Sequence, residues 1–266
     1  MRIVTLIENL VYKQGLGAEH GLSFYMETHG RKILFDTGQT GQFMKNAQTL
    51  GIDITDIDTV IISHGHYDHT GGLYPFLLAN SRAKVYIKEE AFLRKYNGPK
   101  RFIGVPFDQA MLEHRIEYVK EITQVAPQLF IMPGIAIRHP QDTNFGNFKI
   151  SYPGGFANDE FDDELYLCHT DGQAMSIITS CSHRGISNII DGAVAHFKLP
   201  VDLILGGFHI KECGPEQFEV IMTCLERHHP RRIGACHCTG VEKFADMKQR
   251  LGKGVFYNFT GHEITL

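Results

Sequence analysis

A short run of histidines directly after an apolar strand is the feature that most constrains this chain. The strand is predicted over Thr59–Ser63, a β-branched run typical of strands buried on both faces. Four side chains that bind metals follow at once: His64, His66, Asp68 and His69. Imidazole and carboxylate groups suit zinc, iron or manganese. We therefore predict a metal site where a buried strand passes into a loop and then a helix.

The spacing within this loop suggests how its ligands divide. Alternate side chains, His64 and His66, are expected to face one metal, while Asp68 and His69 turn toward a second at the start of the helix. Gly65 permits close backbone approach. A ligand set supplied by protein that leaves room for water is the catalytic pattern. The alternatives are ordinary polar loop residues or a regulatory metal site.

Strand and helix patterns alternate along the rest of the chain. The first third predicts strands at Arg2–Asn9, Leu22–Thr28, Lys32–Asp36 and Lys84–Ile87, a helix capped by Thr40 and ended by Gly51, and a helix over Gly71–Ala79. The second half predicts strands at Glu164–His169, Ala174–Thr179, Val201–Leu205 and Arg232–Ala235, and helices at Ser187–Phe197, Pro215–His228 and Val241–Leu251. This rhythm indicates an α/β domain over residues 1–266, with two sheets packed face to face and helices outside.

The stretch from about Glu89 to Pro140 breaks this rhythm, and we interpret it as an irregular insertion with a helix near Phe92 and some strands. It is locally basic, with Arg94, Lys95, Lys100 and Arg101. These cations form either a solvated surface or a lid that meets an anionic substrate.

Composition excludes several functional classes. The net charge of −4 predicts binding neither to nucleic acid nor to acidic membranes. The first residues carry charge too early for a signal peptide, and no run approaches the roughly 18 apolar residues of a membrane span. The 6 cysteines follow no secreted-scaffold spacing. We therefore expect a cytoplasmic protein with reduced cysteines.

The H-x-H-x-D-H run after an apolar strand resembles the signature of the metallo-β-lactamase superfamily. Residues 34–38, Leu-Phe-Asp-Thr-Gly, also resemble an early element of that family. The resemblance implies a four-layer αββα sandwich with metals at one sheet edge, and a supporting role for Asp36 behind the metal loop. For Asp36 the alternative is a plain turn residue.

Four further segments resemble one subgroup of this superfamily: Ala18–Ser23, Ser180–Ile186, Gly206–His209 and Cys236–Gly240. The subgroup comprises metal-dependent hydrolases often labelled dihydropterin-linked ribofuranosyl-aminobenzene 5'-phosphate synthases. The matching segments span nearly the whole chain, but one fold hosts many chemistries, so the label is a weak guide to substrate.

The resemblance also implies ligands far from the loop. His183 and His237 each follow a predicted strand and are expected to complete the metal site, with structural loop histidines as the alternative. His209 is expected to bind substrate or transfer a proton, or else to bind metal. His20 and Arg184 are further substrate-binding candidates; a structural histidine and a surface ion pair are the alternatives.

The chain departs from the family at one position. Members supply a bridging aspartate from the strand that here reads Ser176–Cys181, and this segment holds no carboxylate. Cys181 is either its replacement as a thiolate ligand or a buried apolar residue. Cys236 and Cys238 flank His237, but neighbours in a strand point to opposite faces, so we predict them to be packing residues.

Together these features predict a metal-dependent hydrolase with one or two divalent ions, zinc first and iron or manganese as alternatives. A water made acidic by the metal attacks a small, anionic substrate, a phosphoester or pterin-related compound. Asp68 orients the water or accepts its proton, and His209 protonates the leaving group. The alternatives are a lactone or thioester hydrolase and a non-catalytic metal-binding sensor.

Overall fold

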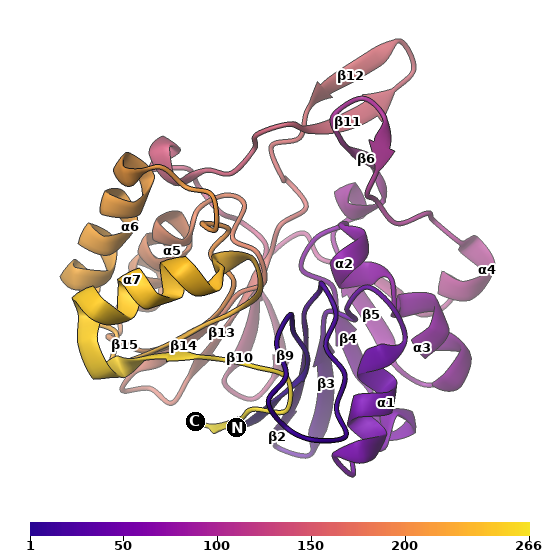
Figure 1. Cartoon of the computed structure of the whole chain (residues 1–266). Coiled ribbons are helices and arrows are strands. Elements are labelled where there is room, and N and C mark those ends of the chain that lie inside the picture. The colour runs from indigo at the N-terminus through magenta and orange to yellow at the C-terminus, as the bar shows by residue number, and fades with distance from the viewer. The chain divides into compact units, whose positions relative to one another are not determined.

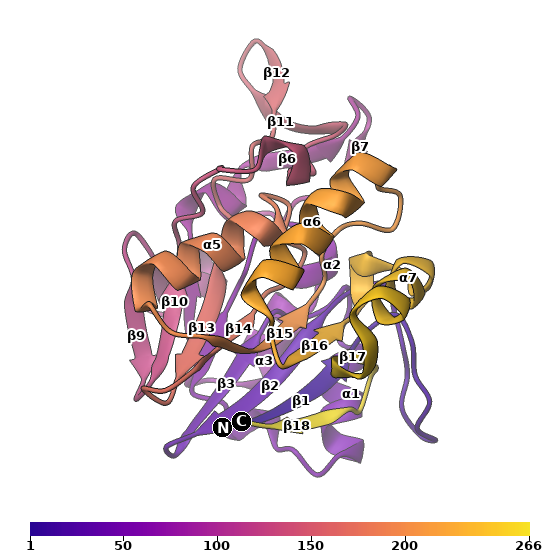
Figure 2. The same ribbon diagram turned by 90° about the vertical axis from the view of Figure 1, so that its left-hand side faces the viewer.

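A computed structural model describes all 266 residues, which form two compact units (Figures 1 and 2). Unit 1 consists of Met1–Lys120, Gly146–Asp163 and Phe259–Leu266. Unit 2 consists of Glu121–Phe145 and Glu164–Asn258. No helix of the chain has the length and apolar character that crossing a membrane requires.

Unit 1 contains a seven-stranded sheet in the order β18-β1-β2-β3-β4-β5-β8. Its strands are β1 (Arg2–Ile7), β2 (Ser23–Thr28), β3 (Arg31–Phe35), β4 (Thr59–Ile61), β5 (Lys84–Ile87), β8 (Ile116–Tyr118) and β18 (Glu263–Thr265). The first three are antiparallel neighbours, and β18 pairs with β1, so the two ends of the chain lie side by side. From β3 to β8 the strands are parallel. The carboxyl ends of β3, β4 and β5 therefore meet at one edge.

Helices cover one face of this sheet (Figure 1). They are α1 (Gln42–Thr49), α2 (Tyr67–Thr70), α3 (Leu73–Ala79) and α4 (Gln109–Leu112), with 3-10 turns η1 (Ile54–Asp56) and η2 (Glu89–Phe92). Phe43 of α1 and Phe76 of α3 are fully buried in one cluster with Val60 of β4. Each such side chain contributes about 1.5–3 kcal/mol by leaving water. This packing fixes the strand that leads into the histidine loop.

Two predicted details of these helices are wrong. The N-cap of α1 is Gly41, although the hydroxyl of Thr40 does accept a hydrogen bond from the amide of Gln42 at 3.1 Å. The helix predicted over Gly71–Ala79 begins two residues later, at Leu73, because the glycine pair separates α3 from the short helix α2.

A small antiparallel sheet in the order β12-β11-β6-β7 also belongs to unit 1. It comprises β6 (Arg94–Asn97), β7 (Arg101–Phe102), β11 (Phe148–Tyr152) and β12 (Gly155–Asn158). In both ribbon views β11 and β12 extend away from the large sheet of this unit. Lys95 on β6 is only 1% exposed and so does not belong to a solvated surface, whereas Arg94, Lys100 and Arg101 are exposed.

Unit 2 contains the other seven-stranded sheet, in the order β17-β16-β15-β14-β13-β10-β9. Its strands are β9 (Thr123–Ala126), β10 (Leu129–Met132), β13 (Tyr166–Thr170), β14 (Met175–Ile178), β15 (Val201–Gly206), β16 (Arg232–Ala235) and β17 (Val255–Tyr257). From β14 to β17 the strands are parallel. Their carboxyl ends again share one edge.

Three helices pack on this second sheet, as Figure 2 shows. They are α5 (Ile186–Phe197), α6 (Pro215–His228) and α7 (Val241–Leu251); the 3-10 turns are η3 (Pro140–Asp142), η4 (His237–Thr239) and η5 (Gly252–Gly254). Ile190 of α5 and Met222 of α6 are fully buried against Ile204 of β15 in one apolar cluster. The helices thus hold the parallel strands whose ends carry the histidines of unit 2.

Candidate metal centre

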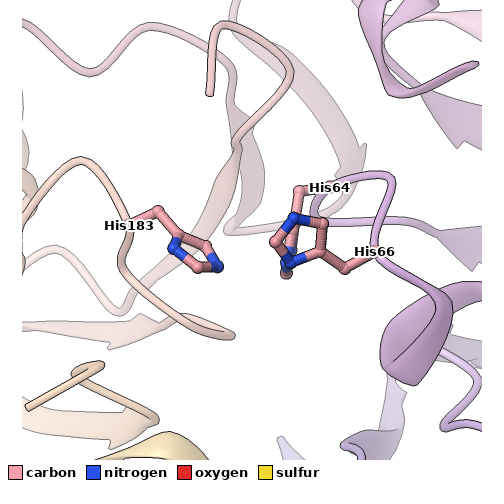
Figure 3. A group of neighbouring side chains, drawn as sticks. All are labelled: His64, His66 and His183. Carbon is pink, nitrogen blue, oxygen red and sulfur yellow. The ribbon is translucent and has the colours of Figure 1, made fainter. Parts of the chain in front are cut away.

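The predicted histidine loop lies at the carboxyl end of β4, in unit 1. His64 and His66 are buried, and their ring centroids are 4.7 Å apart; Figure 3 shows the two imidazoles side by side. The ring of His69, from the first turn of α2, lies 4.4 Å from that of His64. At Gly65 a Cβ atom would overlap the carbonyl oxygen of Ala91, so only glycine fits between the two histidines.

Asp36 supports this loop from the neighbouring strand end. It follows β3 with a positive φ of 59° and is fully buried. Its carboxylate accepts hydrogen bonds from the amide and hydroxyl of Ser63, both at 2.7 Å, and lies 2.8 Å from Nδ1 of His69. The Ser63 hydroxyl in turn lies 2.9 Å from Nδ1 of His64. With their Nδ1 atoms engaged in this way, Nε2 is the nitrogen of each ring that could bind a metal.

A second buried carboxylate, that of Asp163, also holds the loop. Oδ2 of Asp163 accepts a hydrogen bond from the amide of Gly65 at 2.7 Å. Its Oδ1 lies 2.9 Å from Nζ of Lys95, which also contacts Asp159 at 2.6 Å. All three charged side chains are at most 1% exposed. A buried charge is tolerated only when it is paired, so these three side chains stay together. Because Asp163 also binds the amide of Gly65, the triad links the small sheet to the histidine loop.

Asp68 and His20 complete the site of unit 1. Oδ2 of Asp68 lies 3.5 Å from Nε2 of His69 and 3.2 Å from Nε2 of His20. Asp68 is nearly buried, whereas the side chain of His20 is 55% exposed. His20 is therefore placed beside the loop with one face open to solvent.

Electrostatics distinguishes the buried histidines. Burial, together with the neighbouring His69 and His66, holds the pKa of His64 well below its usual 6.5, so its ring is neutral, the form that binds metals. For His69 burial lowers the pKa, but the carboxylates of Asp68 and Asp36 outweigh it and raise the pKa to about 10. A cation is thus favoured beside these two carboxylates.

The candidate residues of unit 2 lie at the carboxyl ends of β14, β15 and β16. Three of the residues there have positive φ without being glycine: Ser182 at 60°, His209 at 50° and His237 at 52°. This left-handed backbone conformation raises the free energy of the folded state by about 1–3 kcal/mol per residue, and it is concentrated at functional sites. Parallel sheets commonly bind ligands at this edge.

The main chain at His183 is held in place by the carboxylate of Glu164. The amide of His183 donates to Oε1 of Glu164 at 2.6 Å, and the amide of Arg184 donates to Oε2 at 2.7 Å. Nδ1 of His183 lies 3.3 Å from the carbonyl oxygen of Asn144. Figure 3 labels this histidine on its loop in unit 2. Nε of Arg184 donates to the carbonyl of Ile135 at 3.0 Å, which fixes one edge of its guanidinium.

Two overlapping groups of donor atoms occur within unit 2. Cys181, His183 and His209 form one, with ligand atoms within 4.8 Å of one another, and the rings of His183 and His209 have centroids 4.2 Å apart. Cys181, His237 and Cys238 form the other, within the same limit. Cys181 belongs to both.

The prediction that Cys236 and Cys238 are packing residues rested on strand alternation, which the folded chain does not have at these positions. The chain leaves β16 at Ala235 and turns through η4, so the alternation of a strand does not apply to residues 236–238. Burial raises the pKa of the Cys238 thiol, but hydrogen bonding with Cys181 and the neighbouring His237 bring it well below 9.0. Cys236, by contrast, is fully buried.

Each unit thus presents donors that fit a divalent metal: buried imidazoles and a carboxylate in unit 1, imidazoles and thiols in unit 2. Sequence reasoning missed Asp163, Glu164 and Cys238. A signal existed for the first two, since an acidic run, Asp162-Asp163-Glu164, lies one residue before the buried strand β13. Lys95 carried no such signal.

Comparison with known proteins agrees with this fold. A family model described as the metallo-beta-lactamase superfamily matches residues 16–157. A solved structure, Tm1679, described as a metal-dependent hydrolase of the beta-lactamase superfamily, has 32% identity and a TM-score of 0.86, covering 100% of this chain and 99% of its own. The predicted α/β fold of the metallo-β-lactamase type is confirmed.

Two relatives come from Methanocaldococcus jannaschii. One is named 7,8-dihydropterin-6-methyl-4-(beta-D-ribofuranosyl)-aminobenzene-5'-phosphate synthase; it is 27% identical over 97% of this chain and 97% of its own length. The other, an uncharacterized protein, is 27% identical over 93% and 94%. With a family model that covers more than half of its residues and a relative that matches it from end to end, the chain belongs to the metallo-β-lactamase superfamily.

Proposed function

We propose that this protein is a metal-dependent hydrolase that acts on a small, anionic substrate, a phosphoester or a pterin-related phosphate. We assign His64, His66, Asp68, His69, His183 and His237 as ligands of one or two divalent ions, zinc first. The observation that carries the proposal is the buried histidine loop, whose rings are oriented by Asp36 and whose backbone is anchored by Asp163. Metal sites with such supports around the ligands are typical of catalytic centres.

A bound divalent ion supplies Lewis acidity, which lowers the pKa of water and polarises a carbonyl or phosphoryl oxygen. Around it, the side chains of this protein have separate roles. Asp68 orients the attacking water and accepts its proton. His209 donates a proton to the leaving group, and His20 binds the substrate beside Asp68.

Positive charge near the loop supports an anionic substrate. Arg101 on β7 donates to the hydroxyl of Tyr67 at 2.9 Å and stacks on its ring, and Tyr67 is the residue after His66. Arg184 adds a second guanidinium next to His183. The name of the curated synthase contains both a dihydropterin and a sugar phosphate, which makes compounds of that class the first to assay.

The test is turnover on a panel of phosphomonoesters, phosphodiesters, thioesters and lactones, with His66→Ala and Asp68→Ala as variants. Loss of the water's proton acceptor costs about 10²–10⁴-fold in rate, so both variants are expected to lose at least that much. His114→Ala is the matched control, because the side chain of His114 is 89% exposed and lies outside the histidine loop. This variant is expected to keep full activity. Undiminished turnover in both site variants would refute the proposal.

One observation favours a second candidate, a metal-binding sensor. The segment Ser176–Cys181 lacks the bridging carboxylate that the resemblance implies for an enzyme. A sensor would bind metal in full and turn over nothing on the panel, with or without chelator. A hydrolase would lose its turnover to the chelator and regain it with zinc.

A further inference from the structure

Cys181 and Cys238 come together although they are 57 positions apart in the sequence, and the Cys238 thiol donates to the carbonyl oxygen of Cys181 at 3.5 Å. Cys181 follows β14 and Cys238 lies in η4 after β16, so the parallel sheet brings them to one edge. The two sulfur atoms and a ring nitrogen of His237 all lie within 4.8 Å of one another. The ligand atoms of a tetrahedral zinc, with bonds of about 2.0–2.3 Å, lie up to about 4 Å apart. The three donor atoms are therefore close enough for one metal ion to bind all of them after a small adjustment of their side chains.

The surroundings are shaped to keep Cys238 in this position. At Gly207 a Cβ atom would lie 2.6 Å from Sγ of Cys238, so the glycine makes room for the sulfur. The amide of His209 donates to that sulfur at 3.3 Å, and an amide donor stabilises a thiolate. Cys181 is 2% exposed, and Cys238 is partly exposed.

We propose that Cys181 and Cys238 bind the metal as thiolates, together with His237, so that unit 2 supplies a sulfur-rich ligand set in place of the missing carboxylate. This inference rests on the proposed function at one point, the role of His237 as a ligand. Two thiolates favour zinc over manganese, which prefers oxygen ligands. Binding releases the two thiol protons to solvent as the two sulfur–metal bonds form.

X-ray absorption at the zinc edge of the zinc-loaded wild-type protein tests the inference without any variant. Sulfur neighbours at about 2.3 Å are expected in addition to nitrogen and oxygen neighbours at about 2.0–2.2 Å. A spectrum fitted by nitrogen and oxygen alone would overturn the inference and leave the proposed function intact. Absence of bound zinc would instead contradict the proposed function itself. A disulfide between Cys181 and Cys238 in the zinc-loaded protein would also overturn the inference.

Cobalt substitution identifies the individual ligands. The cobalt protein is expected to show sulfur-to-metal charge-transfer absorption, of which Cys181→Ser and Cys238→Ser each remove about half and the double variant removes all, because each deletes one of two thiolates. Cys236→Ser is the matched control, since it flanks His237 on the other side and is expected to leave the absorption unchanged. Equal absorption in Cys238→Ser and Cys236→Ser would contradict the assignment of Cys238.

Discussion

Asp163 connects two parts of unit 1 that are far apart in the sequence. One oxygen accepts from the amide of Gly65, between two predicted ligands, and the other contacts Lys95, 68 residues away. A neutral side chain here would leave Lys95 with Asp159 alone and would weaken the anchor of the loop. The carboxylate therefore affects both the stability of unit 1 and the position of the ligands.

We expect Asp163→Asn to lower the free energy of unfolding by about 3–5 kcal/mol, the range for breaking a buried ion pair. Zinc affinity is expected to fall about 10–100-fold, as for other groups that orient metal ligands. Urea unfolding and a zinc titration measure the two effects. Asp162→Asn, at the exposed neighbouring position, is the control; equal behaviour of the two variants would show that Asp163 does not anchor the loop.

At the residue scale, the sequence predicted the candidate ligands that are close in the chain. Four residues were recognisable because their types and spacing alone indicate a metal site: His64, His66, Asp68 and His69. Lys95 and its partners were not, because a lysine is ordinarily solvated and its carboxylates lie 64 and 68 residues away. Only the folded chain brings these charges together.

At the scale of elements, one carboxylate joins two helices of unit 2. Asp191 of α5 lies 2.7 Å from the Nη2 atom of Arg227 and 2.7 Å from the Nε2 atom of His228, both on α6. It also lies 2.7 Å from Nε2 of His139. Burial raises the pKa of Asp191, but the bonds to His139 and His228 outweigh it and bring the pKa below 3.8.

This lowered pKa gives a pH-dependent prediction. The native state binds the proton of Asp191 less readily than the unfolded state, so its stabilisation is present above about pH 4 and is lost as the pH falls through the native pKa. Asp191→Asn is expected to be less stable than wild type at pH 7, by a difference that shrinks on acidification. Urea unfolding from pH 7 to pH 3 measures it, with Asp246→Asn on the surface of α7 as control. A difference that is constant with pH would contradict the assignment.

Elements with clear end signals were predicted with their observed bounds. Helix α6 begins at Pro215, which suits a first helical position, and it ends before His229, which has a left-handed conformation. The short strands β11, β12, β17 and β18 were missed, because segments of three to five residues give little periodicity. The turn at His237 was also missed, and with it the position of Cys238.

At the scale of the whole molecule, strand order was beyond sequence reasoning. The strand β18 returns to pair with β1, and Arg2 binds Glu263 across 261 residues at 2.7 Å. No local pattern encodes such a pairing. The fold type was nevertheless predicted, because the family resemblance spans nearly the whole chain, and the match to Tm1679 confirms it. The single domain with an insertion at about 89–140 stays a prediction.

The central claim is that His66 and His237 are metal ligands. The most direct measurement is the zinc content and zinc affinity of purified His66→Ala and His237→Ala beside wild type, with His114→Ala as control. We predict that each site variant loses bound zinc or binds it at least about 100-fold more weakly, since each lacks a direct ligand. Wild-type zinc content and affinity in both variants would contradict the account.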